Sequence, residues 1–311
     1  MLSIYNFLKV KLCYNTYWKQ WLAFFTVCLL VFACSSDSSD DDTNPIDDTN
    51  PVYLDSNGVT IKARDWAVVG ESGIINGITY TIVDGITLAG MIENGDDVTR
   101  VCTSRIIDMS YMFNVSGVYQ SFNQPIGNWD VSNVTNMREM FAGTMSFNQP
   151  LEYWDVSNVT NMLGMFGYSS FNQPLNDWDV ISVTNMAVMF GFSSFNQPLN
   201  DWNVSNVTIM GSMFGNNDAF NQTIGDWNVS NVNDMSGMFN GATSFNQDIY
   251  SWDVSNVTDM TQMFLNALSF NQDLSSWDVN NVIDCFNFCL NATNWTEPKP
   301  NFSNCGNIYC D

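Results

Sequence analysis

Acidic side chains recur at a fixed interval in this sequence, at the centre of each Trp-Asp-Val or Trp-Asn-Val tripeptide. In a strand, the residue between two inward-facing side chains points outward, so we expect these residues to face solvent. Carboxylates on neighbouring parallel strands, about 4.8 Å apart, repel one another, which either raises some of their pKa values or recruits Ca²⁺. The alternative, which we favour, is that each side chain accepts hydrogen bonds from its own turn. We call these residues the first polar row: Asp130, Asp155, Asp179, Asn203, Asn228, Asp253 and Asp278.

A second polar row immediately precedes the tryptophans, and its residue types vary more from copy to copy. A residue kept in every copy is explained by stacking alone, so we expect the differences between copies to select a ligand. The two rows together form the predicted binding face. The loops after each Met-Phe pair, including Tyr168 and Phe192, could add aromatic contacts to a sugar or a protein. The second row comprises Asn128, Tyr153, Asp177, Asp201, Asp226, Ser251 and Ser276.

Catalysis is the weaker interpretation of these carboxylates. A pair such as Asp177 and Asp179 could suggest glycoside hydrolysis, which uses two acids about 5 to 9 Å apart. Such a pair needs two different environments, whereas the repeats offer nearly the same environment in each copy. The sequence contains no histidine, which removes imidazole bases and His-ligated metals. We expect no enzyme activity and no cofactor other than calcium at the first polar row.

The charge balance restricts the partners. Nine Lys and Arg residues stand against 32 Asp and Glu residues, which gives a net charge of −23. This charge repels nucleic acid, so we expect no nucleic-acid binding. We expect a monomer that binds an extracellular or host protein or a polysaccharide. The alternatives are a glycan-binding module and a structural surface spacer, in which no surface row would bind a ligand better than another.

The N-terminal region has the layout of an export signal. Three lysines precede an apolar run at 21–33, which is shorter than the roughly 20 residues of a membrane span. We predict a signal peptide at 1–33. Val31 and Ala33 before Cys34 resemble a bacterial lipobox, which implies lipidation of Cys34.

The acidic stretch after this cysteine predicts a solvated tether at 34–51. It resembles the export tag of Bacteroidetes lipoproteins, which implies a location on the outer face of the cell outer membrane. The lipid anchor would be the sole contact with the membrane.

The elements that position the polar rows follow a period of 24 or 25 residues. This period predicts a solenoid of stacked repeats at 106–290, behind a β-rich cap at 52–105. The leucine-rich-repeat spacing predicts a short parallel strand centred on Trp-Asp-Val. The apolar spacing of Val134–Phe141 predicts a short helix on the opposite side. We expect the methionines and a row of tryptophans to form the core, the latter being Trp129, Trp154, Trp178, Trp202, Trp227, Trp252 and Trp277.

The repeated unit carries a family resemblance. The stretch FNQPLNDWDVSNVTNMxxMF, the lead-in at 97–113 and the lipoprotein-like start resemble the BspA-like leucine-rich-repeat surface proteins. The resemblance implies a leucine-rich-repeat fold, exposure on the bacterial surface and a role in adhesion or macromolecular binding. It implies no defined ligand.

Four cysteines lie at the C-terminal end, where a cap is expected at 291–311. In an exported chain they predict two disulfides, with three pairings open. A zinc site is the alternative, but the spacing contains no Cys-x-x-Cys pair. Cys102 is left over and is expected to lie buried near the cap. The four cysteines are Cys285, Cys289, Cys305 and Cys310.

Overall fold

The computed structural model describes residues 49–114, 120–306 and 310. They belong to one compact unit. The predicted signal peptide, Cys34 and all but the last three residues of the predicted tether lie outside the described residues. No helix in the described part of the chain is both long and apolar enough to cross a lipid bilayer.

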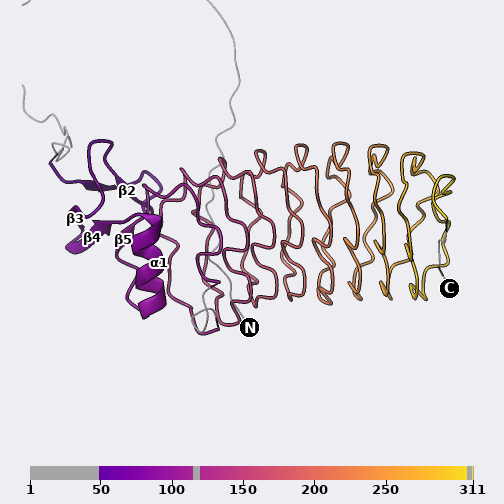
Figure 1. Cartoon of the computed structure of the whole chain (residues 1–311), viewed down its shortest axis with the longest axis horizontal. Coiled ribbons are helices and arrows are strands. Elements are labelled where there is room, and N and C mark those ends of the chain that lie inside the picture. The colour runs from indigo at the N-terminus through magenta and orange to yellow at the C-terminus, as the bar shows by residue number, and fades with distance from the viewer. Residues whose placement is uncertain (1–48, 115–119, 307–309, 311) are drawn as a thin grey trace, which may run out of the picture. The chain divides into compact units, whose positions relative to one another are not determined.

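The N-terminal cap contains two small sheets. The first pairs β1 with β2 in antiparallel register, so that Tyr53 lies opposite Lys62. In the second, β4 lies between antiparallel β3 and parallel β5. Figure 1 shows both at the indigo end of the chain. The bounds are Val52–Leu54 for β1, Ile61–Ala63 for β2, Ser72–Ile75 for β3, Ile78–Ile82 for β4 and Val101–Cys102 for β5.

One helix, α1 at Gly85–Asn94, connects β4 to β5. It begins where the Asp84 carboxylate accepts a 2.8 Å hydrogen bond from the amide of Thr87, and it ends at Gly95, whose φ of 74° is left-handed. Leu88 and Ile92 face inward and join the core of the first repeats. The helix therefore covers the first end of the repeats, where an apolar face would otherwise be exposed.

Each repeat, which we call a coil, is a series of β-turns rather than a strand followed by a helix. In one coil, four turns span Ile224–Trp227, Val229–Val232, Met235–Met238 and Phe239–Ala242. The amide of each fourth residue donates to the carbonyl of the first, at 2.9 to 3.2 Å. All eight of these terminal side chains are buried. A turn brings its first and fourth residues together, so apolar residues three apart can all face the coil interior.

The predicted helix at Val134–Phe141 is therefore wrong. Glu139 has a left-handed φ of 50°, which a continuing helix does not allow. The amide of Met140 bonds to the carbonyl of Met137 within a turn, while the amide of Glu139 donates to the carbonyl of Leu163 in the next coil at 2.7 Å.

The parallel ladder between coils runs through this Met-x-x-Met segment, and the predicted strand at Trp-Asp-Val is also wrong. Isolated parallel bridges join the residue before the first methionine of each coil, for example Asn136 to Asn161 and Asn161 to Asn185. The Trp-Asp-Val tripeptides lie between turns and form no described strand.

The apolar rows stack from coil to coil. The rings of Trp154 and Trp178 lie 6.5 Å apart with an interplanar angle of 4°. The indole Nε1 of Trp178 donates to the carbonyl of Leu151 in the preceding coil at 3.1 Å, so the buried polar atom is paired. The seven repeat tryptophans and the repeat methionines are all buried. The repeat organisation is confirmed, and Figure 1 shows the coils in chain order.

Two disulfides close the C-terminal end. Cys285 pairs with Cys305 and Cys289 with Cys310, at Cα separations of 6.0 and 4.5 Å. Cys285 and Cys289 occupy core positions of the last coil, so the bonds fasten the tail to that coil. Cys102 is a free, buried thiol in β5.

Candidate functional site

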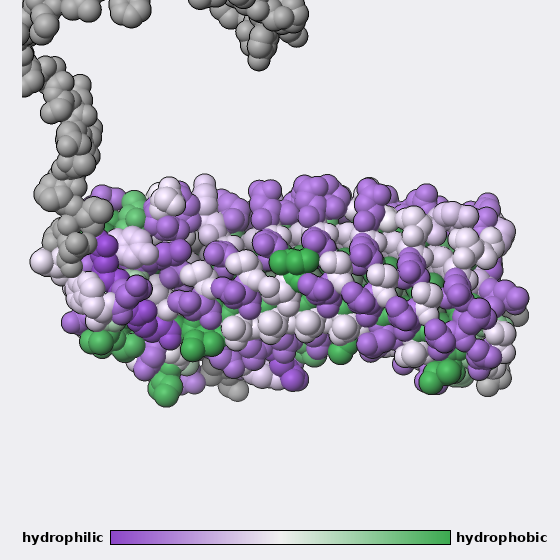
Figure 2. All heavy atoms as spheres, turned by 90° about the horizontal axis from the view of Figure 1, so that it is seen from above, coloured by the Kyte–Doolittle hydropathy of each residue, from purple (hydrophilic) through white to green (hydrophobic). Residues whose placement is uncertain are grey.

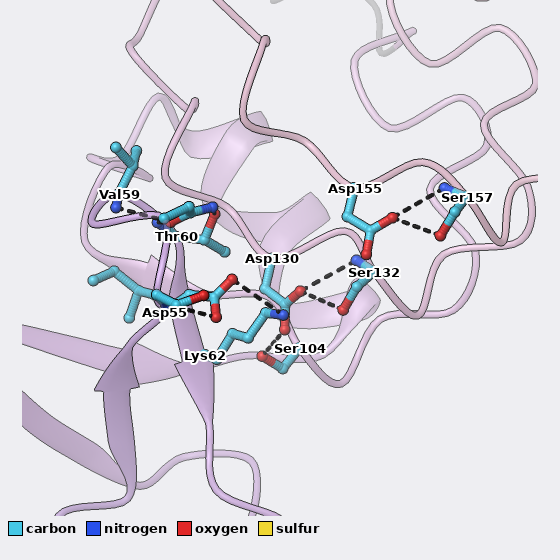
Figure 3. Close-up of polar contacts among 12 residues, drawn as sticks. Asp55, Val59, Thr60, Lys62, Ser104, Asp130, Ser132, Asp155 and Ser157 are labelled. Atoms are coloured by element: carbon cyan, nitrogen blue, oxygen red, sulfur yellow. Dashed lines mark hydrogen bonds and ion pairs between the residues drawn. The ribbon is translucent and has the colours of Figure 1, made fainter. Parts of the chain in front are cut away.

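The first polar row closes turns. Asp155 Oδ1 accepts hydrogen bonds from the amide of Ser157 at 3.1 Å and from its hydroxyl at 2.6 Å (Figure 3). Asparagine fills the same role as aspartate, which shows that the bond and not the charge is common to the row. Equivalent bonds from the backbone amide two residues later reach Asp179, Asn203, Asn228, Asp253 and Asp278.

These bonds decide the direction of the pKa shift at the one exposed row member where a shift is resolved. Hydrogen bonds from Ser255 lower the pKa of Asp253, because they stabilise the carboxylate form. The rise expected from mutual repulsion along the row is therefore wrong at this residue. Its two nearest row positions are Asn228, which is uncharged, and Asp278.

Asp130 does not belong to an exposed face. It is 4% exposed and accepts hydrogen bonds from the hydroxyls of Ser104 and Ser132. Lys62 of β2 lies beside it, paired with Asp55 at 3.4 Å (Figure 3). Burial alone would lower the pKa of Lys62, but the neighbouring carboxylates of Asp130 and Asp55 raise it. Asp130 thus links the cap to the first coils through its hydrogen bonds.

The second polar row is exposed except at Asn128, which is half-buried; the exposed members are Tyr153, Asp177, Asp201, Asp226, Ser251 and Ser276. Tyr153 lines a hollow of about 500 Å³ together with Ile78 and Tyr80 of β4. Asn176 donates to the Asp201 carboxylate. Among the described residues, no three His, Cys, Asp or Glu side chains form a group that could hold a metal ion.

A further row has an unusual backbone conformation. Each Met-Phe pair is followed by a turn that begins with its phenylalanine, and the row consists of the third residue of each of these turns. In five described coils the loop between the two phenylalanine positions has five residues, and the third turn residue is Gly143, Asn216, Gly241, Asn266 or Asn291, each with positive φ. Glycine and asparagine are the residue types that tolerate this conformation. In two adjacent coils the residue is instead Tyr168 or Phe192, each with φ of 56°.

We call Tyr168 and Phe192 the aromatic ledge. Their rings stack 4.3 Å apart at 7°, and the side chains are 50% and 45% exposed. Their loops are also one residue shorter, with four residues between the flanking phenylalanines. In these loops the hydroxyls of Ser169 and Ser193 bond to the carbonyls of Phe166 and Phe190 at 2.8 Å.

Figure 2 shows one face on which hydrophobic residues form separate patches between hydrophilic ones. Exposed aromatic side chains at Tyr168 and Phe192 were expected from the varying loops, but the stacking of their rings was not predicted. The signal that could have found it is the shared shortening of the two loops that carry an aromatic residue.

Comparison with known proteins gives a family. Residues 87–197 and 191–302 each match the family described as "Mycoplasma protein of unknown function, DUF285". No curated protein and no solved structure matches this chain.

Proposed function

We propose, since the chain belongs to the DUF285 family of repeat proteins, that it is a recognition protein of the bacterial surface. In this proposal the coils form a leucine-rich-repeat-like solenoid of the BspA-like kind. Cys34 carries the lipid that anchors the chain to the outer membrane. The solenoid mediates adhesion by binding an extracellular protein or polysaccharide, and it performs no catalysis.

The aromatic ledge is the observation that carries this proposal. A bulky residue in the left-handed region costs about 1–2 kcal/mol relative to its usual conformation. Val188 and Gln262 adopt the left-handed conformation in the Met-x-x-Met turns as well, so the exposed aromatic rings distinguish the ledge. Tyr168 and Phe192 adopt this conformation in two adjacent coils, at a position where the coils on either side have glycine or asparagine. Both side chains are about half exposed, at 50% and 45%, so part of each remains available for contact with a ligand.

A binding screen with the full chain tests the proposal. The chain, purified in mild detergent, is applied to immobilised collagen, laminin and a panel of soluble polysaccharides. We expect saturable binding to at least one of them. The matched control replaces both ledge residues by the glycine that Gly143 and Gly241 supply in other coils. Absence of saturable binding to every member of the panel contradicts the recognition proposal.

A further inference from the structure

We infer that the aromatic ledge binds a pyranose ring of a neutral polysaccharide. This inference rests on the recognition function proposed above and names the class of ligand. It starts from a hollow of about 210 Å³ beside the ledge. Tyr168 lines this hollow and Phe192 does not, so the hollow lies on the Tyr168 side of the pair. The lining residues are Glu139, Ala142, Leu163, Gly164, Gly167, Tyr168 and Val188.

Glycine occupies two positions close to Tyr168. Gly143 takes the equivalent turn position in the coil before Tyr168, so that position contributes no side chain beside the ring. Gly164 forms part of the lining, and a Cβ there would come within 2.9 Å of the Glu139 side chain. Tyr168, half exposed, borders this hollow and is available to a ligand in it.

The residues that line the hollow offer both apolar and hydrogen-bonding contacts, which a sugar ring requires. One face of a pyranose presents C–H groups, which pack against an aromatic face, and its rim carries hydroxyl groups. Ala142, Leu163 and Val188 supply apolar wall, and the Glu139 carboxylate supplies an acceptor for hydroxyl donors. A largely apolar hollow with one polar group of this kind fixes the orientation of a small polar ligand.

The charges in and around the hollow favour a neutral sugar over a cationic side chain or an anionic polysaccharide. The carboxylate of Glu139 is paired with Arg138, whose Nε lies 3.3 Å from Oε1, so the hollow has little free negative charge to attract a lysine or arginine side chain. The net charge of −23 repels anionic polysaccharides. A neutral polysaccharide is the ligand that both observations permit.

The Phe192 ring fixes the orientation of the Tyr168 ring. Phe192 stacks on the Tyr168 ring at 4.3 Å and so holds the tyrosine ring in one orientation. A rigid aromatic side chain loses little conformational freedom when a ligand binds. Phe192 is thus a positioning residue for Tyr168.

Glycine substitutions test the ledge without removing core residues. Affinity electrophoresis of the full chain in mild detergent uses gels that contain galactomannan, arabinoxylan, dextran or hydroxyethylcellulose. We expect at least one of them to retard the wild-type chain. We expect Tyr168→Gly to weaken that binding roughly tenfold or more, as loss of a central aromatic contact does, and Phe192→Gly to weaken it less. Because glycine relieves the left-handed strain, Tm should stay equal or rise in both variants.

The control is Tyr250→Ser, which removes a 53% exposed tyrosine outside the ledge and copies Ser275 of the next coil. It should leave retardation unchanged. Unchanged retardation in Tyr168→Gly overturns the ledge assignment while the recognition function stands. Binding to collagen or laminin without retardation by any of the four polysaccharides overturns the sugar assignment alone. A ledge-dependent interaction with a lysine-rich peptide, in place of retardation, also overturns it.

Discussion

The carboxylate of Asp253 accepts a 3.1 Å hydrogen bond from the backbone amide of Ser255, and Asn228 makes the same bond to Ser230 one coil earlier. If the hydrogen bond, and not the charge, is what this residue contributes to stability, Asp253→Asn should change the free energy of unfolding by less than about 0.5 kcal/mol. Asp253→Ala should lower it by about 1 kcal/mol, because the turn loses its acceptor. Urea unfolding at neutral pH measures both. Equal destabilisation by the two substitutions would show that the charge matters instead.

Acid should weaken the fold through such carboxylates. Hydrogen bonds from Ser255 and Ser275 lower the pKa values of Asp253 and Asp273 in the folded chain. The folded chain then binds fewer protons than the unfolded chain around the ordinary aspartate pKa of about 3.9. The stabilisation is present above this pH and is lost as pH falls through the lower folded values. Urea midpoints should therefore drop below about pH 4, and less in Asp253→Asn than in the wild-type chain. An equal drop in both contradicts the assignment to Asp253.

The turns at Met-x-x-Met give a test of backbone strain. Val188 has φ of 56° at the third position of its turn, where Gly164 stands one coil earlier. Val188→Gly should stabilise the chain by about 1 kcal/mol, and Gly164→Val should destabilise it by about 1–2 kcal/mol. Ala187→Gly, which shortens the neighbouring side chain where φ is not positive, should instead destabilise by about 0.4–1 kcal/mol. Thermal melting of the three variants checks the signs, and destabilisation by Val188→Gly contradicts the turn assignment.

Anchoring depends on one cysteine in our proposal. Cys34→Ser should abolish incorporation of labelled palmitate and move the chain from the membrane fraction to the soluble fraction, since no lipid would hold it. The control is Cys28→Ser, which lies inside the predicted signal peptide and should keep the label. Label that persists in Cys34→Ser, in cells that express the full chain, would contradict lipidation at this residue.

The period and the buried rows were predictable because stacking copies the same apolar residue into every coil. The secondary structure inside a coil was not. Met137 and Met140 are three residues apart, a spacing that fits one face of a helix and equally fits the two ends of a β-turn. The glycines at 164 and 237, both at the third position of the turn with positive φ, were the sequence signal that favours the turn.

The location of the parallel ladder also depends on contacts that a period does not specify. Each Trp-Asp-Val tripeptide has the alternation of a strand, but the Asp side chain bonds to the following turn and the ladder forms at Asn161 and its equivalents instead. The pairing of Cys285 with Cys305 likewise required the geometry of the last coil. Variation between copies predicted the loops that carry Tyr168 and Phe192. The stacking of their two rings could be seen only in the structure.

Positions that are the same in every coil build the scaffold, and positions that differ between coils select the ligand. One binding assay compares the two directly, with the full chain and the polysaccharide that retards it. A variant with Asp155, Asp179, Asp253 and Asp278 all changed to asparagine should bind as the wild-type chain does. A variant with Tyr168→Gly and Phe192→Gly should lose binding. The reverse result, with binding lost in the asparagine variant and kept in the glycine variant, would contradict the claim.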